Sequence, residues 1–310
     1  MERKHFIKNS LLAGASVLSG AAVSAKNRAI AAGAKKTAAG QPFNLNYGIH
    51  DGMFRNTAGA DFIDQIKFAY DQGFRSIEDN GMARRPPEQQ TKIGETLAKL
   101  GMSMGVFVLD KGGNGANTLA AGKAEYLDIF LKGCREAVEV SKRCGGVLAT
   151  VVPGDFERHL PIGIQTANVI DALRRGVEIL EPRKIVMVLE PLSDTPDLFL
   201  RHSDQTYAIC RAVNSPSCKI LFDMYHMQRN EGNIIKNIDL TYSEIGYFQI
   251  GNNPGRNEPT TGEMDYKNIF RHIYEKGYRG VLGMEHGNAR PGKEGETALI
   301  QAYRESDSFK

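Results

Sequence analysis

Short hydrophobic runs alternate with longer amphipathic stretches along most of this sequence. The short runs predict eight strands, at residues 44–50, 76–78, 102–108, 146–152, 184–190, 219–224, 246–250 and 280–284. The longer stretches predict helices at residues 61–72, 87–100, 126–144, 164–180, 204–213, 233–237 and 266–276. Eight strand–helix units within roughly 250 residues are typical of a (β/α)₈ barrel. We therefore expect an α/β protein whose single catalytic domain, a TIM barrel, spans residues 42–303, with a short C-terminal tail at residues 304–310.

A doubly wound sheet is the other common arrangement that alternates strands with helices. Such sheets usually contain fewer strands, and no glycine-rich phosphate-binding turn follows the first predicted strand here. The pattern therefore favours the barrel.

Residues 1–25 have the composition of an export signal. Arg3, Lys4 and Lys8 give it a basic start, a run of hydrophobic and small residues begins at Leu11, and small residues lead up to Ala25, where a peptidase could cut. The basic segment resembles the twin-arginine type of signal, with lysine in place of the second arginine. We expect export to the periplasm. An uncleaved membrane anchor is the alternative, but the run is too short and too rich in Gly, Ala and Ser to span a bilayer comfortably.

Residues 26–41 are rich in Ala, Gly and Lys without an amphipathic period, which predicts a flexible linker. No later segment approaches the length of a transmembrane helix, so we expect no membrane span in the mature chain. Lys and Arg number 39 against 36 Asp and Glu, a balance that argues against a nucleic-acid surface. The four cysteines lack CxxC spacing and are expected to be buried or incidental thiols.

Four predicted strands in the second half end at an oxygen-bearing side chain. These residues are Glu190, Asp223, Gln249 and Glu285, separated by 33, 26 and 36 residues. The intervals bracket the roughly 30-residue length of one strand–helix unit, so the four residues fall at the ends of the fifth to eighth strands. In a TIM barrel those ends converge on one site.

Three carboxylates at such a point would repel one another unless a cation lay among them. Two glutamates, one aspartate and one amide form an all-oxygen ligand set, which suits Mg²⁺ or Mn²⁺. We expect one such divalent cation, with Zn²⁺ less favoured although His226 could in principle join the ligands.

Each of the four residues, taken alone, has an ordinary structural explanation. A glutamate before proline, as at Glu190, often belongs to a helix start or turn, Asp223 could cap the following helix, and Gln249 could satisfy loop backbone groups. Capping does not readily explain why an oxygen-bearing side chain stands at the same position on four consecutive strands.

The stretches FDMYHMQRNEGN, FQIGNNPGRNEPTTGEMDY and GMEHGN resemble the hydroxypyruvate isomerases. These enzymes are members of the xylose isomerase-like barrels, which include ketose 3-epimerases. The resemblance implies that Glu190, Asp223, Gln249 and Glu285 bind the metal and that the two glutamates also act as acid and base. It implies further that His226 and Arg256 contact substrate oxygens. A packed histidine and a surface pair of Arg256 with Glu258 are the alternatives for these two residues.

His50 and Glu78, at the ends of the first and second predicted strands, are further candidates for binding the substrate, although ordinary loop roles are equally open. The expected partner is a small sugar or keto acid. Barrels of this kind often pair, so a homodimer is one expected state.

The parts together predict an isomerase of the aldose–ketose type or an epimerase. A cation that chelates an α-hydroxy carbonyl stabilises the enediolate formed when a glutamate removes the proton between the two oxygens. An exported lyase or hydrolase on 3-keto-sugars or glycosides would use the same site, and a non-catalytic carbohydrate-binding barrel is a further alternative. An abasic-site endonuclease on this barrel would need more histidine ligands and a basic face.

Overall fold

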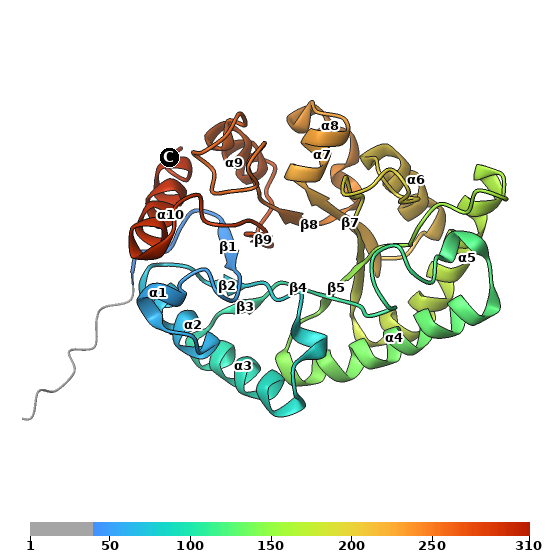
Figure 1. The fold of residues 1–310 in the computed structure, drawn as a ribbon, viewed down its shortest axis with the longest axis horizontal. Helices are drawn as coiled ribbons and strands as arrows, with labels where there is room; N and C mark the ends of the chain where they lie inside the picture. Colours follow the sequence, from blue (N-terminus) through green and yellow to red (C-terminus); the bar gives the residue numbers. More distant parts are fainter. Residues whose placement is uncertain (1–39) are drawn as a thin grey trace, which may run out of the picture. The chain divides into compact units, whose positions relative to one another are not determined.

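The computed structural model describes residues 40–310, so the predicted export signal and residues 26–39 of the predicted linker lie outside the described part. In residues 40–310 the strands form the centre of the fold and the helices surround them (Figure 1). The strands are β1 (Asn46–Ile49), β2 (Ser76–Ile77), β3 (Ser103–Met104), β4 (Val106–Val108), β5 (Leu148–Val151), β6 (Val186–Leu189), β7 (Cys218–Asp223), β8 (Ile245–Gln249) and β9 (Val281–Gly283). This is the single-domain TIM barrel that the sequence predicts.

The nine strands form one sheet in the order β3-β2-β1-β9-β8-β7-β6-β5-β4. Every neighbouring pair is parallel. The two outer strands, β3 and β4, are parts of one predicted strand that is interrupted at Gly105, so the chain itself brings the sheet almost to closure. A Cβ at Gly105 would overlap the hydroxyl of Tyr247, which reaches across from β8. The eight predicted strand positions are confirmed, and the third is split where Tyr247 needs room.

The helices are α1 (Arg55–Ala58), α2 (Phe62–Asp71), α3 (Pro87–Leu100), α4 (Ala124–Cys144), α5 (Ile162–Leu180), α6 (Ser203–Val213), α7 (Met224–Asn230), α8 (Ile234–Thr241), α9 (Tyr266–Glu275) and α10 (Gly292–Ser306). Short 3₁₀ helices lie at Met82–Arg84, Leu119–Ala121, Glu181–Arg183 and Tyr242–Glu244. The sequence pattern did not reveal α1, α7 or α10. Helix α7 follows β7 without a break, so the two share one hydrophobic run, and α10 begins with two glycines within four residues.

Carboxylates of α10 and of the residue after it join the two ends of the described chain. Glu296 accepts hydrogen bonds from the backbone N–H groups of Asn56 (2.7 Å) and Thr57 (2.9 Å) in α1. Asp307 accepts one from the backbone N–H of Asn44 (2.6 Å) and one from the hydroxyl of Tyr47 (2.8 Å). Helix α10 therefore continues past the expected barrel boundary at residue 303, and the first part of the expected tail is attached to the barrel.

The interior of the barrel is filled by a small cluster of buried side chains from five strands: Val106, Val188, Leu221, Tyr247 and Val281. A much larger hydrophobic cluster contains buried residues of both helices and strands, such as Phe130 of α4 and Leu173 of α5. All four cysteines are free and buried, as expected. With its interior packed, the barrel leaves the carboxyl ends of the strands available for a site.

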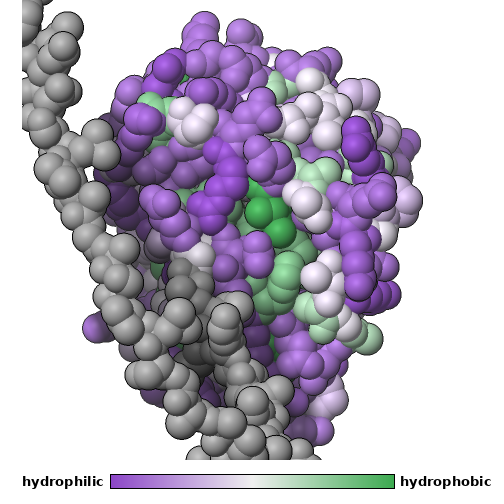
Figure 2. Space-filling view, turned by 90° about the vertical axis from the view of Figure 1, so that its left-hand side faces the viewer, coloured by the Kyte–Doolittle hydropathy of each residue, from purple (hydrophilic) through white to green (hydrophobic). Residues whose placement is uncertain are grey.

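Most of the visible surface on the side that carries α1 and α10 is hydrophilic, with a hydrophobic group near its centre and a few hydrophobic residues scattered around it (Figure 2). Within residues 40–310, no helix combines the length and the hydrophobicity needed to cross a membrane.

Candidate active site

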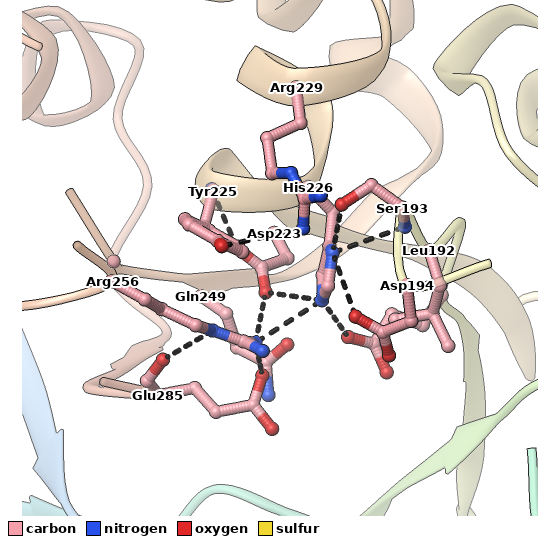
Figure 3. A network of polar contacts seen from close by, with 12 residues as sticks. Leu192, Ser193, Asp194, Asp223, Tyr225, His226, Arg229, Gln249, Arg256 and Glu285 are labelled. Atoms are coloured by element: carbon pink, nitrogen blue, oxygen red, sulfur yellow. Dashed lines mark hydrogen bonds and ion pairs between the residues drawn. The ribbon is translucent and has the colours of Figure 1, made fainter. Parts of the chain in front are cut away.

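Four neighbouring strands place the four predicted ligand residues side by side. Asp223 and Gln249 are the last residues of β7 and β8 and pair directly in the sheet. Glu190 follows β6 by one residue, and Glu285 follows β9 by two. Because β6, β7, β8 and β9 are consecutive neighbours, their side chains meet at one end of the barrel, as the sequence spacing predicts (Figure 3).

The acidic side chains of this group lie close enough to share one ion. Glu190, Asp223, Glu285 and His226 each offer a ligand atom, and these atoms all lie within 4.8 Å of one another. Burial, followed by the charges of Glu285 and Asp223, raises the pKa of Glu190 well above its ordinary value. Burial, followed by the charges of Asp223 and Glu78, raises the pKa of Glu285 to about 8. Glu190 and Glu285 are therefore held in an environment that disfavours their charge unless a cation accompanies them.

The side-chain amide of Gln249 provides a further test of whether a cation fits. Its nitrogen donates a hydrogen bond to Oε1 of Glu78 (2.7 Å), whereas its oxygen is buried and has no hydrogen-bond partner among the described residues. The amide extends toward the space beside Asp223 and Glu285 (Figure 3). An unpartnered buried oxygen next to three carboxylates suits a hard divalent cation. Glu190, Asp223, Gln249 and Glu285 therefore fit such an ion, and we refer to these four residues as the cation site.

Asp223 has two roles that use different oxygens. Its Oδ1 accepts a hydrogen bond from the backbone N–H of Tyr225 (2.7 Å) and so caps α7. Its Oδ2 faces the cluster and accepts from the guanidinium of Arg256 (3.0 Å). The capping role considered from the sequence is confirmed for Oδ1, and Oδ2 is the oxygen that faces the cation site.

Arg256 points into the cluster and does not pair with Glu258. Its Nη2 donates to Asp223 and to Oε2 of Glu285 (2.7 Å), and its Nε donates to the backbone oxygen of Glu285 (3.1 Å). Its guanidinium lies 4.7 Å from the centre of the Tyr225 ring. Glu258 instead accepts from the backbone N–H of Ala289 (2.8 Å). The guanidinium therefore lies where it can contact a substrate oxygen, although that role stays a prediction.

His226 is buried and lies between Ser193 and Arg256. The backbone N–H of Ser193 donates to Nδ1 of His226 (3.2 Å), and the Ser193 hydroxyl lies 2.8 Å from the same atom. Burial lowers the pKa of His226, and on the far side of the ring Nε2 lies 3.2 Å from the guanidinium of Arg256. This nitrogen faces Oδ2 of Asp223 (3.5 Å) and Oε1 of Glu190 (4.0 Å). By distance His226 therefore lies among the possible ligands, as the sequence analysis allowed, beside the four residues of the cation site.

His50 and Glu78 lie next to the cation site. Glu78 has no exposed surface, and its Oε1 lies 2.8 Å from Nε2 of His50. Burial alone would lower the pKa of His50, but the neighbouring Glu78 carboxylate outweighs it and raises that pKa. The expected part of these two residues in substrate binding stays a prediction.

Sequence reasoning missed two residues that contact this group. Asn80 donates from its side chain to Oε1 of Glu285 (2.6 Å), and Ser193 orients His226. Both lie in loops that follow predicted strand ends. Their position after a strand end could have indicated a place in the site, but a lone Asn or Ser in a loop is usually a turn residue.

An open cavity of about 800 Å³ leads to Glu285. Its inner part is lined by His50, Asn80, Arg256 and Glu285, and its outer part by residues of α1 and of the loop before α10, including Arg55 and Arg290. The acidic residue of the outer part, Asp51, pairs with Arg85 (2.8 Å), and within residues 40–310 the side chains of Arg55 and Arg290 have no hydrogen bond or ion pair. The cavity therefore combines acidic groups at its inner end with uncompensated positive charge farther out.

Comparison with known proteins agrees with this arrangement. The model of a family described as xylose isomerase-like TIM barrel matches residues 66–306. A hydroxypyruvate isomerase of Escherichia coli strain K12 is 34% identical over 122 residues, which are 39% of this chain and 47% of that protein. A 2-oxo-tetronate isomerase of Cupriavidus necator is 26% identical over 233 residues, 73% of this chain and 86% of that protein.

Solved structures share the fold at lower sequence identity. The crystal structure of a family 2 AP endonuclease from Brucella melitensis is 22% identical, covers 84% of this chain and 99% of its own, and has a TM-score of 0.71. That of a 3-keto-D-glucoside 4-epimerase from E. coli is 19% identical, covers 84% of this chain and 98% of its own, and has a TM-score of 0.68. At these identities the two structures support the barrel architecture alone.

Proposed function

Because this chain belongs to the xylose isomerase-like TIM barrel family, we propose that it is a divalent-cation-dependent isomerase or epimerase of a small hydroxy-keto acid. Two of its sequence relatives are named as isomerases, one of hydroxypyruvate and one of 2-oxo-tetronate. The observation that carries the proposal is the cation site, where three carboxylates and one unpartnered amide oxygen meet at the ends of four adjacent strands. Binding alone would not require two glutamates in this position.

The residues of the cation site divide the work in the following way. Glu190, Asp223, Gln249 and Glu285 would hold a Mg²⁺ or Mn²⁺ ion, which acts as a Lewis acid toward the carbonyl and hydroxyl oxygens of the substrate. Glu190 or Glu285 takes the proton from the carbon next to the carbonyl, and the same or the other glutamate returns it. A glutamate that binds the ion must be ionised, and the ionised form is the one that can accept a proton.

The surrounding residues orient the substrate and the base. Asn80 and Arg256 each donate to one of the two carboxylate oxygens of Glu285 and so fix its plane. His226, whose Nε2 faces Asp223 and Glu190, is the further group proposed to contact a substrate oxygen. Return of the proton to the neighbouring carbon gives isomerisation, and return to the opposite face of the same carbon gives epimerisation.

The outer part of the cavity supports an acidic substrate. Arg55 and Arg290 line it without an acidic partner, and an arginine fork binds a carboxylate through two parallel hydrogen bonds. Hydroxypyruvate and 2-oxo-tetronate, after which two relatives are named, both carry such a group.

A larger keto-sugar is the second candidate, because the cavity lies within the range of about 300–1,000 Å³ that is usual for drug-sized ligands. A lyase or hydrolase acting on 3-keto-sugars or glycosides would use the same proton transfer. Export to the periplasm and assembly as a homodimer are further parts of the proposal, and they rest on the sequence and on the behaviour of similar barrels.

Proton exchange in D₂O tests the proposed function directly. We expect the protein with Mn²⁺ or Mg²⁺ to introduce deuterium next to the carbonyl of hydroxypyruvate or a four-carbon homologue, as followed by NMR, and to stop doing so after EDTA is added. Neutral ketoses and 3-keto-sugars in the same panel distinguish the two candidates. Absence of exchange with every compound, despite bound Mn²⁺, would contradict the proposal.

The two arginines provide a test of the substrate class. Replacing Arg55 or Arg290 by Gln is expected to raise KM for the acid about tenfold with little change in kcat, because one charge-assisted contact is lost away from the reacting carbon. The effect should shrink at high salt. Arg135, exposed on α4 on the outside of the barrel, is the matched control and should leave KM unchanged when replaced by Gln. If the protein turns over a neutral keto-sugar and none of the three substitutions changes KM for it, the keto-sugar is the favoured substrate.

A further inference from the structure

Glu78 is a fully buried carboxylate at the end of β2 that accepts three hydrogen bonds. Its Oε1 accepts from the side-chain nitrogen of Gln249 (2.7 Å) and lies 2.8 Å from Nε2 of His50. Its Oε2 accepts from the hydroxyl of Tyr247 (2.7 Å). Both oxygens are thus occupied by groups of the barrel itself, and neither is free to reach a substrate.

The surrounding backbone makes room for this carboxylate. A Cβ at Gly283 would overlap Oε2 of Glu78, and a Cβ at Gly105 would overlap the hydroxyl of Tyr247. Glycine therefore stands in β9 and in the break between β3 and β4, the two places where the pair formed by Glu78 and Tyr247 needs room. The position of Glu78 is fixed from both sides.

A carboxylate in this place determines how the amide of Gln249 is turned. The oxygen and the nitrogen of a glutamine amide have nearly the same shape, so hydrogen-bond partners decide which end points where. An ionised carboxylate only accepts, so it holds the NH₂ end of Gln249. The oxygen must then face away from Glu78, toward Asp223 and Glu285, where it has no donor among the described residues.

We infer that Glu78 is a positioning residue, which acts through Gln249 by holding the amide oxygen toward the cation site. This inference rests on the proposed function, because it assigns the unpartnered oxygen to a divalent cation. It also gives Glu78 a role different from the substrate contact that its place at a strand end suggests. Partners that orient metal ligands typically change metal affinity by about 10–100-fold when they are removed.

A matched pair of substitutions separates orientation from charge. Glu78→Leu removes both the charge and the acceptor, so the Gln249 amide is no longer held. Glu78→Gln also removes the charge, but its oxygen can still accept from Gln249 and His50 while its NH₂ donates to the Tyr247 hydroxyl, which can accept. Titration with Mn²⁺, followed by EPR of the free ion, should show a loss of affinity of about 10–100-fold in Glu78→Leu and of less than about threefold in Glu78→Gln. Equal losses in both variants, or none in either, would overturn the inference.

Two further variants control for general disturbance of the network. Tyr247→Phe removes another hydrogen bond to Glu78 but leaves the bond between Oε1 and Gln249, so Mn²⁺ affinity should stay within about threefold of wild type. In a Gln249→Leu background, Glu78→Leu should cause no additional loss, since the residue through which it acts is already absent. An additive loss would show that Glu78 acts by another route and would overturn the inference.

A crystal structure of the wild-type protein with Mn²⁺ decides the question if Glu78→Leu does not fold. The expected result is Oε1 of Gln249 on the ion and its nitrogen on Glu78. An ion that lacks Gln249, or a turned amide, would overturn the inference while leaving the proposed function intact. A wild-type protein that binds no Mn²⁺ at all would overturn both.

Discussion

Replacing Glu190 or Glu285 by Gln is expected to lower the rate of proton exchange by about 10³-fold or more, near the upper end of what general acid–base catalysis usually contributes. Glutamine keeps the size of the side chain and one oxygen, but it cannot take up or return a proton at neutral pH. Both residues are predicted ligands as well as bases, so each change removes a charge from the cation site and a catalytic group at once. Exchange measured by NMR at saturating Mn²⁺ separates the catalytic loss from weaker ion binding.

Glu190→Gln should leave the metal-free protein at least as stable as wild type. Glu190 is buried, and burial together with neighbouring carboxylates raises its pKa well above the usual range. It has no ion pair with a lysine or arginine within residues 40–310. A neutral amide removes the cost of burying that charge. Thermal unfolding in EDTA should therefore give an equal or higher Tm for Glu190→Gln.

An exposed glutamate on the outside of the barrel supplies the control for both measurements. Glu178 pairs with Arg175 in α5, and its side chain is 66% exposed. Glu178→Gln should change neither the exchange rate nor Tm by a measurable amount. Wild-type exchange in either Glu190→Gln or Glu285→Gln would exclude that residue as the acid or base, and a large fall in Tm without a loss of exchange would indicate a structural role.

The strand ends could be predicted from the sequence because burial leaves a clear signal there. Burying a Glu, Asp or Gln side chain at the end of a hydrophobic run lowers the stability of the fold unless that side chain has a partner. Four such runs at the spacing of one strand–helix unit locate Glu190, Asp223, Gln249 and Glu285 without any structure. The same reasoning found all eight strand positions, because parallel strands buried on both faces are hydrophobic throughout.

The partners of these residues could not be predicted because loop residues have too many ordinary uses. Nothing in the sequence distinguishes Asn80, which contacts Glu285, or Ser193, which orients His226, from turn residues. The orientation of the Gln249 amide depends on Glu78, 171 positions earlier in the chain, and appears only when β2 and β8 lie in one barrel. Chain proximity suggested Glu258 for Arg256, but three-dimensional proximity pairs Arg256 with Asp223 and Glu285.

The stability of the protein is expected to depend on pH in opposite directions with and without a divalent cation. In the metal-free protein, the pKa of Glu285 is raised from 4.5 to about 8, and that of Glu190 is raised as well. Below about pH 4.5 these groups are protonated in both the folded and the unfolded chain. Between pH 4.5 and 8 the unfolded chain loses the protons first, so the free energy of unfolding should fall as the pH rises.

A bound cation reverses this slope because its ligands must lose their protons before they bind it. Apparent Mn²⁺ affinity should rise by up to about tenfold per pH unit for each proton displaced. An ion that binds only the folded state stabilises that state, by about 2.7 kcal/mol when its concentration is one hundred times its Kd. Thermal unfolding from pH 5 to 8.5 should therefore show Tm falling in EDTA and rising in a fixed excess of Mn²⁺. Calorimetry in buffers of different ionisation enthalpy counts the protons released.

The double variant Glu190→Gln, Glu285→Gln is the control for this pH dependence. It lacks both groups whose pKa values are raised at the cation site, so its Tm in EDTA should vary less between pH 5 and 8.5 than that of wild type. Parallel slopes with and without Mn²⁺ in the wild-type protein would mean that the ion binds without displacing protons from these glutamates. In that case the two glutamates would not be its ligands, and their raised pKa values would have to serve the proton transfer alone.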